Sequence, residues 1–324
     1  MTGVKRRPRR VALDCTAATQ PTLPLHMPSA PLPSLPRMTQ ARAPLTHEVE
    51  VLDELGQRRR ILIPAERALT LFIDKRELVT LMTLGEAPEA LVIGYLRNMG
   101  LIAAVDELES VTVDWDVAAA AVRTRHGIDA LEQKTARRVV TTGCGQGTVF
   151  GDLMAQIDTL TLPPPEAARI RVSALYAMLD TMRQRDSVHR RAGSVHGCAL
   201  FRNRELLRAV EDVGRHNAVD TIAGWMWLQD GQATIGGADT VFYTTGRLTS
   251  EMVVKAARMG VPIIVSRNGV TQSGLELAVR LGMTLFGRAA NRRFTCYSGF
   301  ERVDFDVEPR LARALASALA EPGL

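Results

Sequence analysis

Cysteine is scarce in this 324-residue sequence, and none of its four cysteines belongs to a C-x-x-C pair. That absence excludes a zinc ribbon and a thioredoxin-type redox motif, and the wide spacing of the cysteines gives no disulfide framework. Such a chain suits a reducing compartment, so we predict a cytoplasmic protein. The cysteines are Cys15, Cys144, Cys198 and Cys296.

Long apolar runs and internal repeats are missing as well. No run approaches the roughly 20 apolar residues that a membrane-spanning helix needs, so no membrane partner is expected. No pattern recurs at a period of about 20–50 residues, the signature of repeat architectures. The apolar fraction of 46% and the charged fraction of 23% are ordinary for a globular protein.

Positive charge is concentrated at the N-terminus. Residues 1–42 contain seven Lys or Arg and one acidic residue, so the rest of the chain is almost neutral although the total is +5. A basic tail is not a basic folded face, and no nucleic-acid partner is expected. Half of the 16 prolines lie in residues 1–45, which we predict to be a disordered tail. KRRPRR is not followed by an apolar h-region; a targeting or partner-binding role is the alternative to a solvated tail.

Residues 46–140 are predicted to form a smaller, strand-rich α+β region. LTLFI and LVTLM have the composition of two strands joined around residues 74–75, and a helix from about 86 to 99 is expected to end at Gly100. VTVDWD and AAAVRTR are further short stretches of alternating character. A mobile loop that contains Cys144 is predicted to follow at residues 141–164.

Residues 165–324 are predicted to form a layered α/β core. An apolar stripe predicts a helix over about 165–188, and SVHGCALF and ELLRAVED predict an antiparallel hairpin around the turn RNR. Beyond this hairpin, helices of about ten residues alternate with strands of buried composition. This order is typical of a sheet with helices on its faces.

Polar residues gather in a turn that follows a strand of this core, where ligands bind in α/β sheets. In EDVGRHNAVD four polar side chains come directly before a helix: Asp212, Arg215, His216 and Asn217. Capping the helix needs only one of them. We therefore predict that these residues bind a ligand or take part in catalysis.

Three other segments carry candidate binding residues. TTGRLTSEM leads from a strand through Gly246 and Arg247 into a helix, an arrangement that suits a phosphate, with an ordinary loop as the alternative. Three arginines flank the last strand and suit an anion or an exposed edge: Arg288, Arg292 and Arg293. In VHGC, His196 and Cys198 point to one face of a strand; a metal half-site is the alternative to packing, which we prefer for Cys198.

The loop TTGCGQGTVFGD raises two interpretations of Cys144. Four glycines within nine residues leave the backbone free to approach another molecule. Cys144 is therefore either a reactive thiol on a mobile loop or a small apolar residue in a tight turn.

EDVGRHNAVD, followed by TTGRLTSEMVVKAARMGVPIIVS, resembles the signature of the FdhD family of formate dehydrogenase accessory sulfurtransferases. LMTLGEAPEALVIGYLRNMGLI and RRAGSVHGCALF are similar to two further blocks of that family. The resemblance covers residues 69–297, nearly all of the folded chain, and EDVGRHNA is its most specific part.

The resemblance implies a cytidine-deaminase-like α/β core, a homodimer, and binding of the guanine-dinucleotide form of the molybdenum cofactor as cargo. It also implies that Cys144 carries persulfide sulfur from a cysteine desulfurase to that cofactor, which formate dehydrogenase requires. The family's loop commonly holds C-x-x-C, whereas Gly147 occupies the second position here. One thiolate can accept and release sulfur, and its reactivity depends on access and on a lowered pKa.

Two alternatives to sulfur transfer follow from the same residues. A chaperone that delivers the molybdenum cofactor without sulfur chemistry needs no reactive Cys144. Deamination is not expected, because a zinc deaminase uses H-x-E with P-C-x-x-C, whereas His196 is followed by Gly197 and Cys198. We expect no metal of the protein's own.

Overall fold

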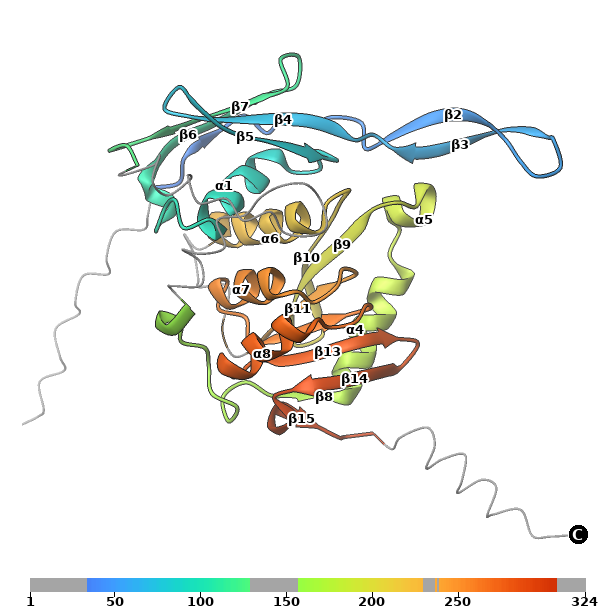
Figure 1. Cartoon of the computed structure of the whole chain (residues 1–324), viewed down its shortest axis with the longest axis vertical. Helices are drawn as coiled ribbons and strands as arrows, with labels where there is room; N and C mark the ends of the chain where they lie inside the picture. Colours follow the sequence, from blue (N-terminus) through green and yellow to red (C-terminus); the bar gives the residue numbers. More distant parts are fainter. Residues whose placement is uncertain (1–33, 129–156, 230–236, 238, 308–324) are drawn as a thin grey trace, which may run out of the picture. The chain divides into compact units, whose positions relative to one another are not determined.

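A six-stranded mixed sheet is the central feature of the structure, a computed structural model that describes residues 34–128, 157–229, 237 and 239–307 (Figure 1). Its strand order is β10-β9-β11-β12-β13-β14. The middle strands β11, β12 and β13 are parallel, β9 is antiparallel to both its neighbours, and β14 is antiparallel to β13. The strands are β9 (His196–Arg202), β10 (Glu205–Asp212), β11 (Thr240–Thr244), β12 (Ile263–Ser266), β13 (Thr284–Ala290) and β14 (Arg293–Ser298).

Helices cover both faces of this sheet, as expected for the predicted α/β class. Because side chains alternate along a strand, Cys198 and Leu200 of β9 join a buried cluster with α6, α7 and α8. Ala199 and Phe201 point the other way and pack with α4. The helices are α4 (Val172–Gln184), α6 (Arg215–Gln229), α7 (Ser250–Arg258) and α8 (Gln272–Arg280).

A five-stranded sheet of order β1-β6-β7-β4-β5 forms the N-terminal part, with α1 (Pro88–Asn98) packed against it. The predicted turn between two of its strands is confirmed: Asp74 and Lys75 have φ values of 46° and 72°, typical of a two-residue hairpin. α1 ends where predicted, since Gly100 follows it with φ 67°. The strands are β1 (Arg37–Met38), β4 (Arg67–Ile73), β5 (Arg76–Thr83), β6 (Leu108–Asp114) and β7 (Ala119–Thr124).

Helices α1 and α6 touch at a pair of glycines, which joins the N-terminal part to the core (Figure 1). A Cβ atom on Gly94 would lie 1.7 Å from the carbonyl oxygen of Asp220, and one on Gly224 would lie 1.9 Å from that of Ala90. No side chain fits at either distance. Glycine at both positions is what allows the two backbones to pack so closely.

The structure corrects three predicted boundaries. The tail was predicted to reach residue 45, but Arg37 and Met38 pair with β6, so strand structure begins inside it; residues 1–33 lie outside the described part. The cysteine loop was predicted to be mobile to residue 164, but Ile157 is 1% exposed and belongs to the core cluster. Burial of its apolar side chain fixes that end of the loop.

The helix predicted to begin near residue 165 begins instead at Val172. Just before it, β8 (Ile170–Arg171) pairs with β15 (Val303–Asp304). Arg302 is 2% exposed and donates hydrogen bonds to the carbonyl oxygens of Pro163 and Ala168. In a continuous helix these carbonyl oxygens would instead accept hydrogen bonds from backbone N–H groups four residues further on. The spacing of apolar residues in the sequence does not show that Arg302 takes their place.

The remaining elements are short or peripheral. A two-stranded hairpin consists of β2 (Thr46–Leu52) and β3 (Arg58–Pro64), and α5 (Val188–Ala192) contacts β3. Single 3-10 turns cover Val105–Glu107, Ile157–Thr159 and Phe300–Arg302.

Candidate functional site

Three strand ends bring the two predicted polar turns together at one edge of the central sheet. Asp212, the last residue of β10, pairs with His196, the first residue of β9. Thr244, the last residue of β11, pairs with Cys198 of β9 and with Ser266 of β12. Turns that are more than 30 residues apart in the sequence therefore face one another, as expected at the carboxyl ends of strands in an α/β sheet.

Arg215 lies at the centre of this edge. Its side chain packs against Gly246, where an added Cβ atom would lie 3.0 Å from Arg215 Cδ and 3.2 Å from its Cβ. A side chain at position 246 would therefore crowd Arg215, which would have to shift by a few tenths of an ångström. We call Arg215, Gly246, Arg247 and His196 the strand-end site.

The Arg215 side chain is largely buried, and no counter-charge for it lies among the described residues. The residue is 5% exposed, its Nε is fully buried, and it makes no hydrogen bond or ion pair with any residue that the structure describes. An unpaired buried cation is strongly unfavourable. An anion bound beside Arg215 would offset this cost.

The electrostatics of His196 agree with an anion site. Partial burial and the positive charges of Arg215, His189 and Arg247 hold the pKa of the His196 imidazole below its usual value of 6.5. His196 is half-buried and Arg247 is exposed, so the site opens to solvent on the Arg247 side. Positive charge from two different turns and from β9 thus converges here.

The turn that enters α7 is rigid and has an uncapped helix start. Ser266 Oγ donates to the carbonyl oxygen of Gly246 at 2.6 Å, and Gly246 N donates to Thr244 Oγ1 at 3.0 Å. Thr249, the N-cap residue, forms no side-chain cap bond, and its buried hydroxyl has no partner among the described residues. The free N–H groups of such a helix start attract anions.

Asp212 and Asn217 were predicted to bind the ligand, but the structure commits both to the fold. Asp212 is 2% exposed and accepts hydrogen bonds from Thr83 Oγ1 at 2.5 Å and from the backbone N of Leu84 at 3.1 Å. It also accepts from Gly214 N and Asn217 Nδ2, and Asn217 donates to the carbonyl oxygen of Met82. These bonds join the turn to β5, so the side chains are internal cross-links.

Among the described residues, His216 and the three C-terminal arginines have no hydrogen bond or ion pair with Arg215. The Nδ1 atom of His216 faces inward, 3.3 Å from Glu251 Oε1. Arg288, Arg292 and Arg293 are exposed at the β13–β14 hairpin, and Arg292 pairs with Asp180 at 3.3 Å. No hydrogen bond or ion pair among the described residues joins these three arginines to the strand-end site, so their part in anion binding stays a prediction.

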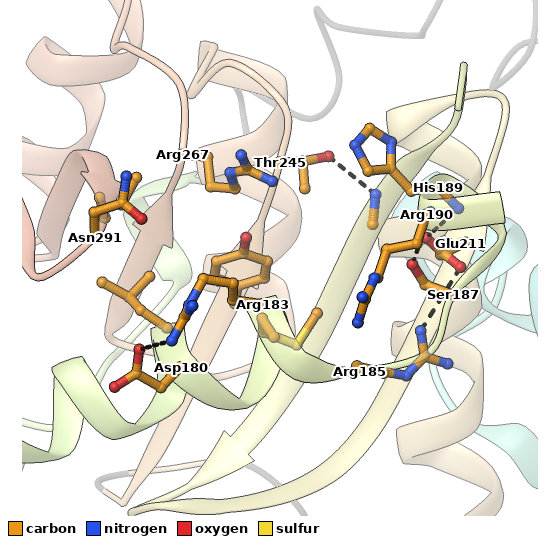
Figure 2. Close-up of a pocket in the computed structure, with 16 residues that line it drawn as sticks. Asp180, Arg183, Arg185, Ser187, His189, Arg190, Glu211, Thr245, Arg267 and Asn291 are labelled. Carbon is orange, nitrogen blue, oxygen red and sulfur yellow. Dashed lines mark hydrogen bonds and ion pairs between the residues drawn. The ribbon is translucent and has the colours of Figure 1, made fainter. Parts of the chain in front are cut away.

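A second basic feature, a cavity of about 160 Å³ on the α4 side of the same strand ends, was not anticipated from the sequence. Arg183 pairs with Asp180 at 3.1 Å, and Arg185 lies 3.7 Å from Glu211. Figure 2 shows these side chains around the cavity. The basic run RQRDSVHRR was its one sequence signal, and such runs are usually solvated faces. The charged and polar lining includes Arg183, Arg185, Arg190, Arg267, Tyr243 and Thr245.

The cysteines divide into a buried one, a half-buried one and two outside the described residues. Cys198 is 0% exposed, and burial raises the pKa of its thiol to about 12; its Sγ lies 3.4 Å from Thr244 Oγ1. This confirms the predicted packing role for Cys198. Cys296 is half-buried, and Cys15 and Cys144 lie outside the described ranges.

Two kinds of feature are absent from the part of the chain that the structure describes. In that part of the chain, no three His, Cys, Asp or Glu side chains are grouped so that they could hold a metal ion. No helix there is long and apolar enough to cross a membrane.

The layered sheet and the strand-end site define an α/β protein with a largely buried, unpaired arginine among the described residues at the carboxyl ends of its strands. The sequence matches the model of the FdhD/NarQ family over residues 64–304, so the chain belongs to that family. The resemblance drawn from EDVGRHNAVD is thereby confirmed. The finer description of the fold as cytidine-deaminase-like stays a prediction.

Named relatives agree with this assignment. A sulfur carrier protein FdhD from Bacillus subtilis is 32% identical over 241 residues, which cover 74% of this chain and 88% of that protein. A sulfur carrier protein FdhD from Listeria monocytogenes is 28% identical over 241 residues, which cover 74% of this chain and 91% of that protein. A crystal structure described as that of a formate dehydrogenase accessory protein from Desulfotalea psychrophila superposes with a TM-score of 0.63 at 25% identity, covering 81% of this chain and 100% of that one.

Proposed function

We propose that this protein is an accessory sulfurtransferase that carries persulfide sulfur on Cys144 from a cysteine desulfurase to the molybdenum cofactor of formate dehydrogenase. The observation that supports this most directly is Arg215, a buried cation without a counter-charge among the described residues. The molybdenum cofactor in its guanine-dinucleotide form is an anionic substrate of the kind such a site takes. The names of the relatives support the sulfur-carrying and accessory roles.

The cargo would be held at the strand-end site. Arg215 and Arg247 supply forked guanidinium donors for a phosphate, and the start of α7 beside Gly246 supplies backbone N–H groups. Asp212 and Asn217 support the turn that carries Arg215 instead of touching the ligand. The homodimer expected for the protein is also part of this proposal.

Sulfur loading requires only one thiolate on the protein. The Cys144 thiolate attacks the terminal sulfur of the desulfurase persulfide; a new S–S bond forms, the old S–S bond breaks, and the desulfurase thiolate leaves. Because Gly147 occupies the position three residues beyond Cys144, the loop has no second thiol there to intercept this persulfide. The thiol exchange therefore does not depend on a C-x-x-C pair.

The absence of that pair also favours a second candidate. A chaperone that delivers the molybdenum cofactor without sulfur chemistry would use the same anion site and would need no cysteine on this loop. The two functions differ in one respect only, the need for the Cys144 thiol.

Replacing Cys144 with alanine separates the two functions. In a host that lacks its own copy of this protein, we expect the C144A variant to leave formate dehydrogenase activity at the level of the empty host, because burial raises the thiol pKa of both described cysteines, Cys198 and Cys296. The control is C198A, which removes a buried thiol and should retain activity. Undiminished activity with C144A would leave the chaperone as the function.

Ligand binding is expected to raise the pKa of His196. Burial, Arg215, His189 and Arg247 hold this pKa below 6.5 in the free protein, so the unfolded chain binds the proton more tightly and acidification through this range destabilises the fold. A bound phosphate reverses the surrounding charge, so binding takes up a proton and affinity rises as pH falls through the His196 pKa. NMR titration of His196 with and without GDP measures this. An unchanged pKa at saturating GDP would contradict the site.

A further inference from the structure

The hydroxyl of Ser266 is buried at the end of β12 and has no part in the function proposed so far. The residue is 0% exposed and pairs with Thr244 of β11. Its Oγ atom accepts a hydrogen bond from the backbone N of Asn268 at 2.9 Å and donates one to the carbonyl oxygen of Gly246 at 2.6 Å. The second bond runs only in this direction, because a carbonyl oxygen accepts and cannot donate. Ser266 therefore holds the strand-end site from a strand that supplies none of that site's own residues.

Both hydrogen-bonding groups of Gly246 are used by side chains from two neighbouring strands. Its N–H donates to Thr244 Oγ1 at 3.0 Å, at the end of β11, and its carbonyl oxygen accepts from Ser266 at the end of β12. The turn continues into Leu248, whose N–H donates to the carbonyl oxygen of Gly269 at 3.0 Å. These bonds fix the backbone at Gly246, although glycine by itself restricts its backbone angles very little.

The bond from Ser266 decides which way the peptide between Gly246 and Arg247 points. In a planar trans peptide the carbonyl and N–H groups point in opposite directions. Because the Gly246 carbonyl oxygen faces the buried hydroxyl, the N–H of Arg247 points away from it. That N–H makes no hydrogen bond with any residue that the structure describes, and Arg247 is exposed. The peptide therefore presents a free donor on the side opposite Ser266.

Arg215 packs against the same glycine. A Cβ atom on Gly246 would lie 3.0 Å from Arg215 Cδ, so the stem of the arginine contacts the backbone from which the Arg247 N–H projects. Arg215 is 5% exposed and has no hydrogen bond or ion pair among the described residues. A guanidinium and a free backbone N–H beside one glycine are donors of the kind that bind an anionic oxygen. A carbonyl oxygen in place of that N–H would repel the anion.

We propose that Ser266 is a positioning residue for the strand-end site. Its hydroxyl turns the Gly246–Arg247 peptide so that the carbonyl oxygen faces the core and the N–H is available to the anionic group that binds there. The contact between this N–H and the ligand rests on the proposed function. The orientation of the peptide does not, and the two can be measured separately.

Calorimetric titration of the full-length protein with GDP tests the contact, with Ser266→Ala as the variant. Without the hydroxyl the peptide is free to rotate, so we expect GDP binding to weaken about 10-fold, which corresponds to about 1.4 kcal/mol. The matched control is Ser298→Ala, which removes another buried hydroxyl (4% exposed) that donates to a carbonyl oxygen, that of Met283, at 2.8 Å. Both variants should lose similar stability in urea, but Ser298→Ala should bind GDP as tightly as the wild type.

NMR of the wild-type protein tests the same contact without relying on a variant that folds. In ¹H–¹⁵N spectra, with an Arg247→Lys variant to assign the signal, saturating GDP should move the Arg247 amide proton downfield as it donates to the anion. We expect this shift to be lost or reduced in Ser266→Ala at saturating GDP. An Arg247 amide that GDP does not move in the wild type would overturn the proposal.

The orientation of the peptide is tested without ligand, by crystal structures of the wild type and of Ser266→Ala. We expect the Gly246 carbonyl oxygen to face Ser266 in the first structure and to leave this direction in the second.

The outcomes separate this proposal from the proposed function. If Ser266→Ala loses stability but keeps the GDP affinity and the peptide orientation, Ser266 is only structural and the proposal is wrong, while the ligand assignment stands. If GDP does not bind even to the wild type, the ligand assignment of the strand-end site fails, and the crystal structures still decide whether Ser266 turns the peptide.

Discussion

Replacement of Gly94 by alanine is expected to lower the free energy of unfolding by about 3 kcal/mol or more, or to prevent folding. The new Cβ atom would lie 1.7 Å from the carbonyl oxygen of Asp220, and that oxygen belongs to the backbone of α6. A backbone atom cannot rotate away as a side chain can. The helices would have to separate, which opens the contact that carries the N-terminal part on the core. Urea denaturation followed by circular dichroism measures the change.

The control for this prediction is another glycine with space around it. A Cβ atom on Gly269 meets nothing within 4 Å, and its φ is not positive, so Gly269→Ala should leave the denaturation midpoint nearly unchanged. Gly224→Ala should resemble Gly94→Ala, because its Cβ atom would lie 1.9 Å from the carbonyl oxygen of Ala90. A Gly94→Ala protein as stable as the wild type would show that α1 and α6 do not pack as described.

Replacement of Arg215 by methionine is expected to weaken GDP binding about 10- to 100-fold, since hydrogen bonds to charged groups contribute about 1.5–3 kcal/mol. The same substitution should leave the protein as stable or raise its free energy of unfolding by about 1 kcal/mol or more, because it replaces an unpaired buried cation with an apolar chain. Arg215 is 5% exposed and has no hydrogen bond within the described residues. Loss of binding combined with unreduced stability is the signature of a functional arginine.

Arg302 is the matched control, because it is equally buried but is used by the fold. It is 2% exposed and donates to the carbonyl oxygens of Ala168, Pro163 and Gly282 at 3.2, 2.7 and 2.9 Å. Arg302→Met should therefore lower stability and leave GDP affinity unchanged. If Arg215→Met destabilised the protein and bound GDP normally, Arg215 would be structural and the strand-end site would lose its main support.

The two clusters of positive charge lie on either side of the same strand ends. His189 lines the α4-side cavity and also lowers the pKa of His196, so the cavity and the strand-end site are electrostatic neighbours. The arginines of the cavity are partly neutralised by Asp180 and Glu211. Arg215 has no such partner among the described residues, so its charge is the one more available to an anion.

Local signals in the sequence determined much of the fold and part of the site. Buried-type strands alternating with short helices predicted the α/β layers, and Gly100 and the pair Asp74–Lys75 marked a helix end and a turn because their backbone conformations are local requirements. The motif EDVGRHNAVD identified the family and located Arg215. Gly246 and Arg247 were predicted beside a phosphate, and the structure places Gly246 against the Arg215 side chain.

Only the tertiary structure decided which polar residues are free to act. Asp212, Asn217 and Arg215 look alike in the sequence, yet Thr83 and Leu84, more than 120 residues away, occupy Asp212, while nothing described occupies Arg215. Glu251 likewise reads as an ordinary residue in the first turn of a helix until the fold brings it to His216. Composition and spacing report what a residue can do, but its burial and its partners come from segments distant in the chain.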